Sequence, residues 1–380
     1  MKKEVIFIMS YPWFSLYQRP NHFAHLFKRN GYGVQVIEMR HLVRLNSILN
    51  RMKFEEHRRD IDRLWSVVRF PFIGLENVQL SRKIRNIFAE KGRETESVFW
   101  LQGFDDAVDY DRLMPMLQGR TVLDVSDSFP DFFTDPKVRK RLERAEKTVA
   151  TKVDVVLATA EVLYDKFKAY NQKTFLIKNG VDLSRYQNMA IPSDPVLAQK
   201  MEAAGRTKIV AYQGGIASWF DFDLMENVVR KNPDFSFLFV GMVDVRVRRE
   251  FGRLSHNQNV YYLGAVGPDV LPWILSKIDV GIIPFKINDL IRATNPIKLY
   301  EYLAAGKPVV ATPMVEVMRY EGKGIVATAG DPEAFGALVR EMAALSSDPP
   351  AREKRLRIAD ENTWEARFMK LLEDVPELRQ

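Results

Sequence analysis

Short apolar runs alternate with longer stretches of helical periodicity along most of the chain. Six runs in the first half have the length and composition of buried strands: residues 5–9, 34–37, 97–101, 121–125, 153–158 and 174–177. Between the first two, apolar positions recur at helical spacing after Pro20 and stop at Asn30-Gly31. Such alternation is typical of parallel sheets covered by helices on both faces.

The pattern then restarts. Further strands are expected at residues 208–212, 235–240, 260–263, 280–284 and 308–311. Two successive sets predict two Rossmann-like domains, at about 1–180 and 181–354, with a hinge near 179–200. The charged tail, about 355–380, is expected to be helical, with Trp364 and Phe368 four apart as a docking face.

Composition narrows the classes of protein. The 380 residues include no cysteine, which excludes disulfides, thiolate zinc sites and cysteine nucleophiles. The first apolar run is too short for a signal peptide, and no run approaches the roughly 18 apolar residues of a spanning helix. We expect a cytoplasmic protein that at most lies against a membrane.

The net charge of +7 is concentrated in one segment. Residues 40–93 hold thirteen Lys/Arg against six Asp/Glu, so the rest of the chain is nearly balanced. Such a segment suits an anionic membrane, contacted through Arg51, Arg58 and Arg59, or a phosphorylated acceptor. An ordinary solvated surface explains it equally well. Nucleic acid is not expected, because basic and aromatic residues are not interleaved in a recognised module.

Loops after the second set of strands hold the best candidates for a ligand site, since open parallel sheets bind ligands beyond the carboxyl ends of their strands. Gly214-Gly215 follows the strand at 208–212, and two glycines allow backbone amides to approach a diphosphate. A plain tight turn is the alternative. No G-x-G-x-x-G or Walker motif is present, which argues against a dehydrogenase or an ATPase.

A second loop leads through Thr294-Asn295-Pro296 into a helix with Lys298 and Glu301 on one face. Lysine can neutralise a phosphate, and glutamate can accept hydrogen bonds from a ribose diol. A surface ion pair, worth about 0.3 kcal/mol, is the alternative. Gly264 follows the strand at 260–263, where exposed backbone would read a nucleobase edge or simply form a turn.

Carboxylates follow a strand in the first half as well. Asp124 and Asp127 accompany the strand at 121–125, and a carboxylate there can act as a general base on an acceptor hydroxyl, or serve as a cap. Four residues near the first loop are candidate acceptor contacts, with aromatic rings for sugars and a guanidinium for phosphate: Tyr11, Trp13, Arg19 and His22.

No metal is expected. His22 and His25 are three apart on a helix but have no evident third ligand. The three Asp-x-Asp triplets, which begin at Asp60, Asp109 and Asp221, do not clearly end a strand, and we interpret them as structural.

Three motifs together resemble one family. Gln18–His22 resembles a Q-R-P-x-H opening, Asn179–Asp182 an N-G-V-D passage between domains, and Asn295–Val310 an N-P-x-K-l-x-E-Y-l-A-x-G-x-P-V-V block. The chain is thus similar over nearly its whole length to GT-B glycosyltransferases, and more narrowly to bacterial polysaccharide transferases of family 4, such as teichuronic-acid-type enzymes.

The resemblance implies two Rossmann-like domains facing across a cleft, with the 355–380 helix returning to the first. Lys298 would contact the donor diphosphate, Glu301 the ribose and Gly214-Gly215 the phosphates, with Thr294 and Asn295 beside the sugar. Asp127 lies where such enzymes often place a catalytic residue. The implied reaction transfers a sugar from a nucleotide sugar, taken as a UDP-sugar, to a glycan or lipid-linked acceptor.

One departure leaves the stereochemistry open. Retaining members carry glutamates eight positions apart, and while Glu301 matches the second, Ala293 stands at the first. If the enzyme inverts, Asp127 is the candidate base; if it retains, front-face attack assisted by the leaving phosphate is expected. The alternatives are a nucleotide-sugar epimerase on the same fold and a non-catalytic nucleotide-sugar-binding subunit.

Overall fold

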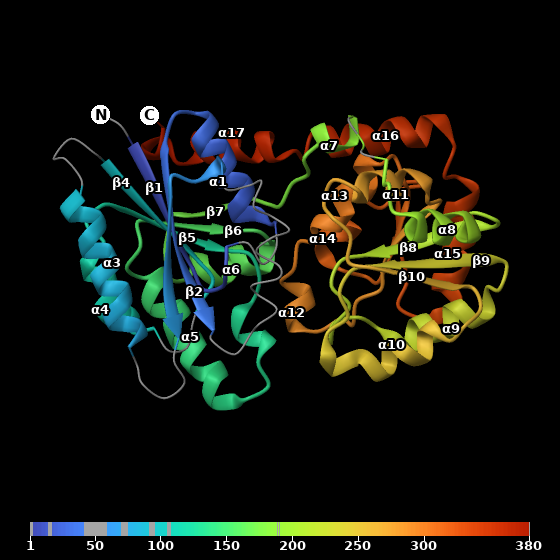
Figure 1. Ribbon diagram of the computed structural model, residues 1–380, viewed down its shortest axis with the longest axis horizontal. Coiled ribbons are helices and arrows are strands. Elements are labelled where there is room, and N and C mark those ends of the chain that lie inside the picture. The colour runs from blue at the N-terminus through green and yellow to red at the C-terminus, as the bar shows by residue number, and fades with distance from the viewer. Residues whose placement is uncertain are drawn as a thin grey trace. The chain divides into compact units, whose positions relative to one another are not determined.

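The computed structural model describes residues 3–13, 17–41, 59–69, 75–90, 96–104, 108–187, 189 and 191–379. The chain forms two compact units, Met1–Lys178 with Trp364–Gln380, and Asn179–Thr363. In each, helices cover both faces of a parallel sheet (Figure 1). Arg51 and Arg58, two of the expected membrane contacts, lie outside the described residues.

The described strands of the first unit have the order β3-β2-β1-β4-β5-β6-β7. Its elements are β1 (Lys3–Met9), α1 (Arg19–Arg29), β2 (Gly33–His41), β3 (Arg63–Arg69), α3 (Glu76–Glu90), β4 (Glu96–Gln102), α4 (Tyr110–Leu113), the 3-10 helix η2 (Met114–Met116), β5 (Arg120–Val125), η3 (Phe129–Phe132), α5 (Pro136–Ala150), β6 (Val155–Ala158), α6 (Glu161–Lys168), β7 (Thr174–Leu176), α17 (Trp364–Asp374) and η5 (Pro376–Leu378).

The second unit has the order β10-β9-β8-β11-β12-β13 in its described strands. Its elements are α7 (Ser184–Gln187), α8 (Pro195–Ala204), β8 (Lys208–Gln213), α9 (Phe222–Lys231), β9 (Phe235–Val240), η4 (Val245–Val247), α10 (Arg248–Ser255), β10 (Val260–Gly264), α11 (Leu271–Lys277), β11 (Val280–Ile283), α12 (Asp289–Arg292), α13 (Ile297–Ala304), β12 (Val309–Ala311), α14 (Val315–Met318), β13 (Val326–Thr328), α15 (Pro332–Ala344) and α16 (Pro349–Asp360).

The apolar pattern explains why these strands are central. Val5 in β1 lies opposite Val34 in β2 and Val98 in β4, and all three are buried. Every expected strand is present, while β3 and β13 are additional strands at sheet edges. Strand order reverses beside β1 and beside β8, and ligands bind at such switch points in open parallel sheets.

The predicted return of the final helix is confirmed, since α17 belongs to the first unit. Trp364 and Phe368 are each 2% exposed. The Phe368 ring lies 5.0 Å from that of Phe27, and the Trp364 ring is stacked on His22 at 4.5 Å. In the described part of the chain, the helices are all too short or too polar to cross a membrane.

Candidate functional site

Three neighbouring strands of the second unit end in glycines with left-handed backbone. Gly214 follows β8 with φ +111°, Gly241 follows β9 with φ +138°, and Gly264 ends β10 with φ +74°. Their loops are joined, because Gly214 N donates to Val240 O at 2.9 Å and Gly241 N donates to Gly264 O at 2.8 Å. A Cβ on Gly241 would lie 2.0 Å from the Gly214 carbonyl oxygen, so these loops approach too closely for side chains.

Gly215 is fixed within the same loop. Its carbonyl oxygen accepts hydrogen bonds from Tyr212 Oη at 2.7 Å and from Trp219 Nε1 at 3.2 Å. Sequence reasoning selected Gly214, Gly215 and Gly264 but missed Gly241. The signal was present, because Gly241 also directly follows a buried strand.

Lys298 lies against this glycine loop. A Cβ built on Gly214 would be 3.5 Å from Lys298 Nζ, so the ammonium group lies beside the backbone of β8's terminal loop. The same nitrogen is 4.5 Å from the centroid of the Phe285 ring and 5.4 Å from that of Tyr212, and both rings are buried. Aromatic faces stabilise a cation there. The first turn of α13 and a fixed positive charge therefore favour an anion at this position.

Glu301 follows one turn later on α13. Its carboxylate accepts a hydrogen bond from Gln213 Nε2, at the end of β8. Burial raises the pKa of Glu301 above the usual glutamate range, against the opposing effects of Lys298, the Gln213 hydrogen bond and Arg185. The structure thus brings Lys298, Glu301 and the Gly214 loop together, as the sequence predicted.

Two residues near Glu301 were not predicted. Burial, and then the charge of Glu301, raise the pKa of Tyr186 in α7 well above its usual range. Arg185 donates to Asp182 Oδ2 at 3.1 Å and lowers the Glu301 pKa. No sequence motif marks them, because α7 lies far from α13 along the chain.

Thr294 and Asn295 make hydrogen bonds within the protein. Thr294 Oγ1 donates to Leu290 O at 2.8 Å. Asn295 is 2% exposed, and its side chain accepts from Asn179 N at 3.0 Å and donates to Tyr300 Oη at 3.0 Å and Glu316 Oε2 at 3.2 Å. These bonds fix Asn295 between the segment at Asn179 and helices α13 and α14.

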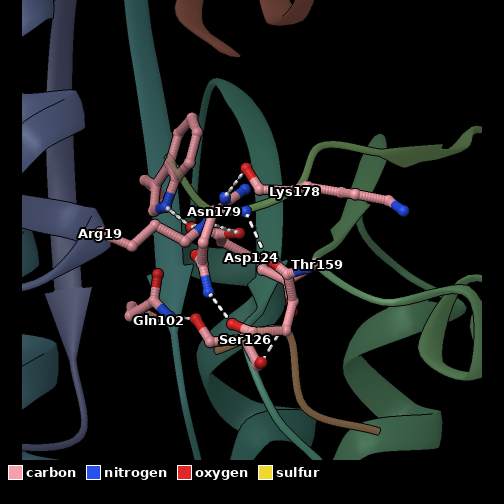
Figure 2. A network of polar contacts seen from close by, with 9 residues as sticks. Arg19, Gln102, Asp124, Ser126, Thr159, Lys178 and Asn179 are labelled. Carbon is pink, nitrogen blue, oxygen red and sulfur yellow. Dashed lines mark hydrogen bonds and ion pairs between the residues drawn. The ribbon is translucent and has the colours of Figure 1, made fainter. Parts of the chain in front are cut away.

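In the first unit, Arg19, a predicted acceptor contact, forms a buried ion pair. Arg19 is 2% exposed, and its Nε donates to both carboxylate oxygens of Asp124 at 2.9 Å (Figure 2). Its Nη1 donates to Lys178 O at 3.0 Å, and Trp100 Nε1 donates to Asp124 at 3.3 Å. Burial raises the pKa of Asp124, and Arg19 opposes this shift. The pair ties α1 to β5.

Trp13 and His22, two further predicted acceptor contacts, both pack against aromatic rings of the first unit. Trp13 is 1% exposed, its ring lies 5.7 Å from that of Phe7, and its backbone N–H donates to Glu38 Oε2 at 2.7 Å. The His22 ring is covered by Trp364, at an interplanar angle of 16°. The Trp13 ring is therefore part of the core, whereas His22 is half-buried with one face of its ring on Trp364.

Tyr11 and Asp127 are brought together. The pKa of Tyr11 is raised by burial, then by the negative charges of Asp124 and Asp127. Asp127 is half-buried in the loop after β5. The preceding residue fixes that loop, because Ser126 O accepts from Thr159 Oγ1 and Ser126 Oγ from Gln102 Nε2, both at 2.7 Å (Figure 2).

Unpaired polar atoms lie near this loop, at the carboxyl ends of β1 and β4. Among the described residues, Ser10 Oγ, Gln102 Oε1 and Arg19 Nη2 are buried without a hydrogen-bond partner. Buried polar groups normally have partners, so this edge has unused hydrogen-bonding capacity for a polar ligand.

The Asp-x-Asp triplets have structural partners. Asp109 and Asp221 cap α4 and α9, Asp60 pairs with His25, Asp62 with Lys28 and Asp111 with Lys152. Over the part of the chain that the structure describes, no three His, Asp or Glu side chains are grouped to hold a metal ion.

Comparison with known proteins finds a family match within the second unit. Residues 218–344 match the family model described as "Glycosyl transferases group 1". Part of the second unit is thus similar to this glycosyltransferase family. The chain is 28% identical over 242 residues to TuaH of Bacillus subtilis (strain 168), a protein provisionally assigned as a teichuronic acid biosynthesis glycosyltransferase. That match spans 62% of this chain and 59% of TuaH.

Solved structures show the fold of the whole chain. Anabaena Alr3699/HepE in complex with UDP-glucose superposes with a TM-score of 0.70 at 13% identity, over 98% of this chain and 100% of that one. Sucrose-phosphate synthase from Thermosynechococcus elongatus has a TM-score of 0.71 at 14% identity, over 99% of each chain. The fold is GT-B, as the sequence predicted.

Proposed function

We propose that the protein is a glycosyltransferase that moves a sugar from a UDP-sugar to a glycan or lipid-linked acceptor in bacterial surface polysaccharide synthesis, at the cytoplasmic face of the membrane. The match of residues 218–344 to the group 1 family supports the reaction class. TuaH, with its assignment to teichuronic acid biosynthesis, supports the pathway, and HepE, solved with UDP-glucose, supports the donor.

One observation carries the donor proposal: Lys298 Nζ lies against the backbone of Gly214, and Glu301 lies one turn away on α13. A nucleoside diphosphate has an anion next to a ribose diol. Lys298 and the glycine loop would bind the diphosphate, and the Glu301 carboxylate would accept hydrogen bonds from the ribose hydroxyls. Gly264, with open space around its Cα, would lie near the base.

The chemical step would break the bond between the anomeric carbon and the diphosphate oxygen and form a bond to the acceptor oxygen. Lys298 and the α13 N-terminus would stabilise the leaving diphosphate, which removes the need for a metal. The acceptor proton would pass to Asp127 in an inverting reaction, or to the leaving diphosphate in front-face attack. Ala293 is 2% exposed and supplies no carboxylate for either route.

Nucleotide binding tests the donor site. Isothermal titration with UDP, GDP and dTDP should show that UDP binds best. Lys298→Ala should weaken UDP by about 10–100-fold, since a hydrogen bond to a charged group contributes about 1.5–3 kcal/mol. Lys231→Ala, which removes an exposed lysine at the end of α9, is the matched control. The proposed donor site is wrong if none of the three nucleotides binds, or if Lys298→Ala and Lys231→Ala bind UDP with the same affinity.

The buried Ala293 favours a second candidate, a non-catalytic nucleotide-sugar-binding subunit, because the carboxylate of retaining relatives is missing. A turnover assay distinguishes a transferase from a non-catalytic binding subunit. A transferase consumes UDP-sugar only when an acceptor is added and yields a glycoside whose anomeric configuration NMR can assign. Tight binding without turnover across a broad acceptor panel would support the subunit.

A further inference from the structure

One helix of the first unit presents a strongly basic outer face. Helix α5 has Leu142, Glu146, Val149 and Ala150 buried against the protein. Five exposed cations lie on the opposite side, within about 120° of arc at 100° per residue: Lys137, Lys140, Arg141, Arg144 and Lys147.

The acidic residues of α5 do not neutralise this face. Glu146 is on the buried side, where it pairs with Lys166, and Glu143 accepts from Arg139, which also pairs with Asp131. Among the described residues, no ion pair is formed by Lys137, Lys140 or Arg144. The three cations Lys137, Lys140 and Arg144 therefore favour an anionic partner on this face.

Two exposed aromatic rings precede the basic helix. Phe132 and Phe133 are each 39% exposed, and α5 begins three residues after them. Both are held by Phe129, whose ring centroid lies 6.0 Å from that of Phe132 and 6.4 Å from that of Phe133. Phe129 itself packs on Phe104 at 6.2 Å. The aromatic pair is thus part of a built cluster.

We propose that the basic face of α5 and the Phe132-Phe133 pair form a binding surface for an anionic lipid bilayer. Lysine and arginine side chains are attracted to anionic headgroups, and aromatic rings insert at the boundary between headgroups and acyl chains. The rings favour a bilayer over a soluble polyanion, which has no apolar layer to receive them. Asp127 is two residues before Phe129, so the surface shares a loop with the candidate base.

Vesicle cosedimentation tests this without any sugar transfer. The full chain is mixed with phosphatidylcholine vesicles containing 0 or 40% phosphatidylglycerol (~40% is a typical anionic fraction) at low and high salt. The protein should bind strongly only to the anionic vesicles, and only at low salt. The triple variant K137Q/K140Q/R144Q should bind roughly 100-fold more weakly, since each cation near the surface contributes about fivefold.

Two further variants sharpen the test. F132S/F133S should also reduce vesicle binding, while K231Q/R248Q/R249Q, which removes three exposed cations from the second unit, should bind as the wild type does. Unchanged melting temperatures would show that all variants fold. The proposal is overturned if the protein does not bind anionic vesicles, or if K137Q/K140Q/R144Q binds them as the wild type does. It is also overturned if vesicle binding instead requires Arg51, Arg58 and Arg59. It also fails if F132S/F133S binds normally and soluble polyphosphate competes fully, because the partner is then a polyanion.

Discussion

The three strand-end glycines allow a quantitative test of how the donor loop is built. In Gly241→Ala, the new methyl group would lie 2.0 Å from Gly214 O and 2.7 Å from its carbonyl carbon. Backbone must therefore move by about 1 Å to reach an ordinary contact. The substituted residue would also have to keep φ at +138°.

Both effects have known magnitudes. A left-handed backbone costs about 1–2 kcal/mol for alanine, and overpacking costs about 1–3 kcal/mol. The sum, about 2–5 kcal/mol, lowers the melting temperature by about 4–20 °C for a unit of this size. Because the displaced atom belongs to Gly214, which contacts Lys298, the affinity for UDP should fall by about 10–100-fold.

Two other glycines serve as controls. A Cβ on Gly264 would meet nothing within 4 Å, but the residue has φ +74°. Gly264→Ala should therefore lower the free energy of unfolding only by the cost of the left-handed backbone. Gly252, inside α10, has neither problem, and Gly252→Ala should stabilise by about 1 kcal/mol. Calorimetric melting and UDP titration measure all three. If Gly241→Ala melts no lower than Gly264→Ala, or binds UDP as tightly as the wild type, the proposed coupling of the loops is refuted.

Three further predictions concern the carboxylates. Burial raises the pKa of folded Glu301 above its unfolded value, so the folded state binds more protons and the free energy of unfolding should fall as pH rises through that pKa. Glu301→Gln should remove this pH dependence of the free energy of unfolding. It should also remove the pH dependence of UDP affinity, because protonation of the Glu301 carboxylate weakens UDP binding in the wild type. If the wild type and the variant differ by the same amount at every pH, the prediction is wrong. Asp127→Asn should reduce transfer by about 10²–10⁴-fold with UDP affinity unchanged if the reaction inverts, and full activity would remove its role as base. Asp124→Ala should destabilise the first unit by about 3–5 kcal/mol in urea unfolding, because it leaves the buried Arg19 charge unpaired; a loss below 1 kcal/mol would show that the pair is not important.

The central strands, and the grouping of Lys298 and Glu301 with the Gly214 loop, could be predicted because both depend on local pattern. Strand ends position Gly214 and Gly264, and helical spacing places Lys298 and Glu301 on one face. The missed strands lacked that pattern. β3 begins and ends with arginine, and β13 spans only Val326–Thr328, so neither contains an apolar run long enough to stand out.

The aromatic and cationic residues of the first loop could not be assigned from the sequence. A ring that stacks on a ligand and a ring that packs in a core look alike in a short motif. Trp13 is held by Glu38 of β2, His22 by Trp364 of α17, and Arg19 by Asp124 of β5. Each partner lies on a distant segment, so a short motif could not show where these three side chains pack.

The return of α17 has a consequence for synthesis of the protein. The second unit is continuous in sequence, whereas the first is complete only after Trp364–Gln380 has been made. At about 5–20 residues per second, translation of the intervening segment takes on the order of 10–40 s. During that time Phe27 and His22 lack the rings of Phe368 and Trp364 that cover them. Until its last helix is made, the first unit therefore presents an open apolar face that a chaperone can recognise.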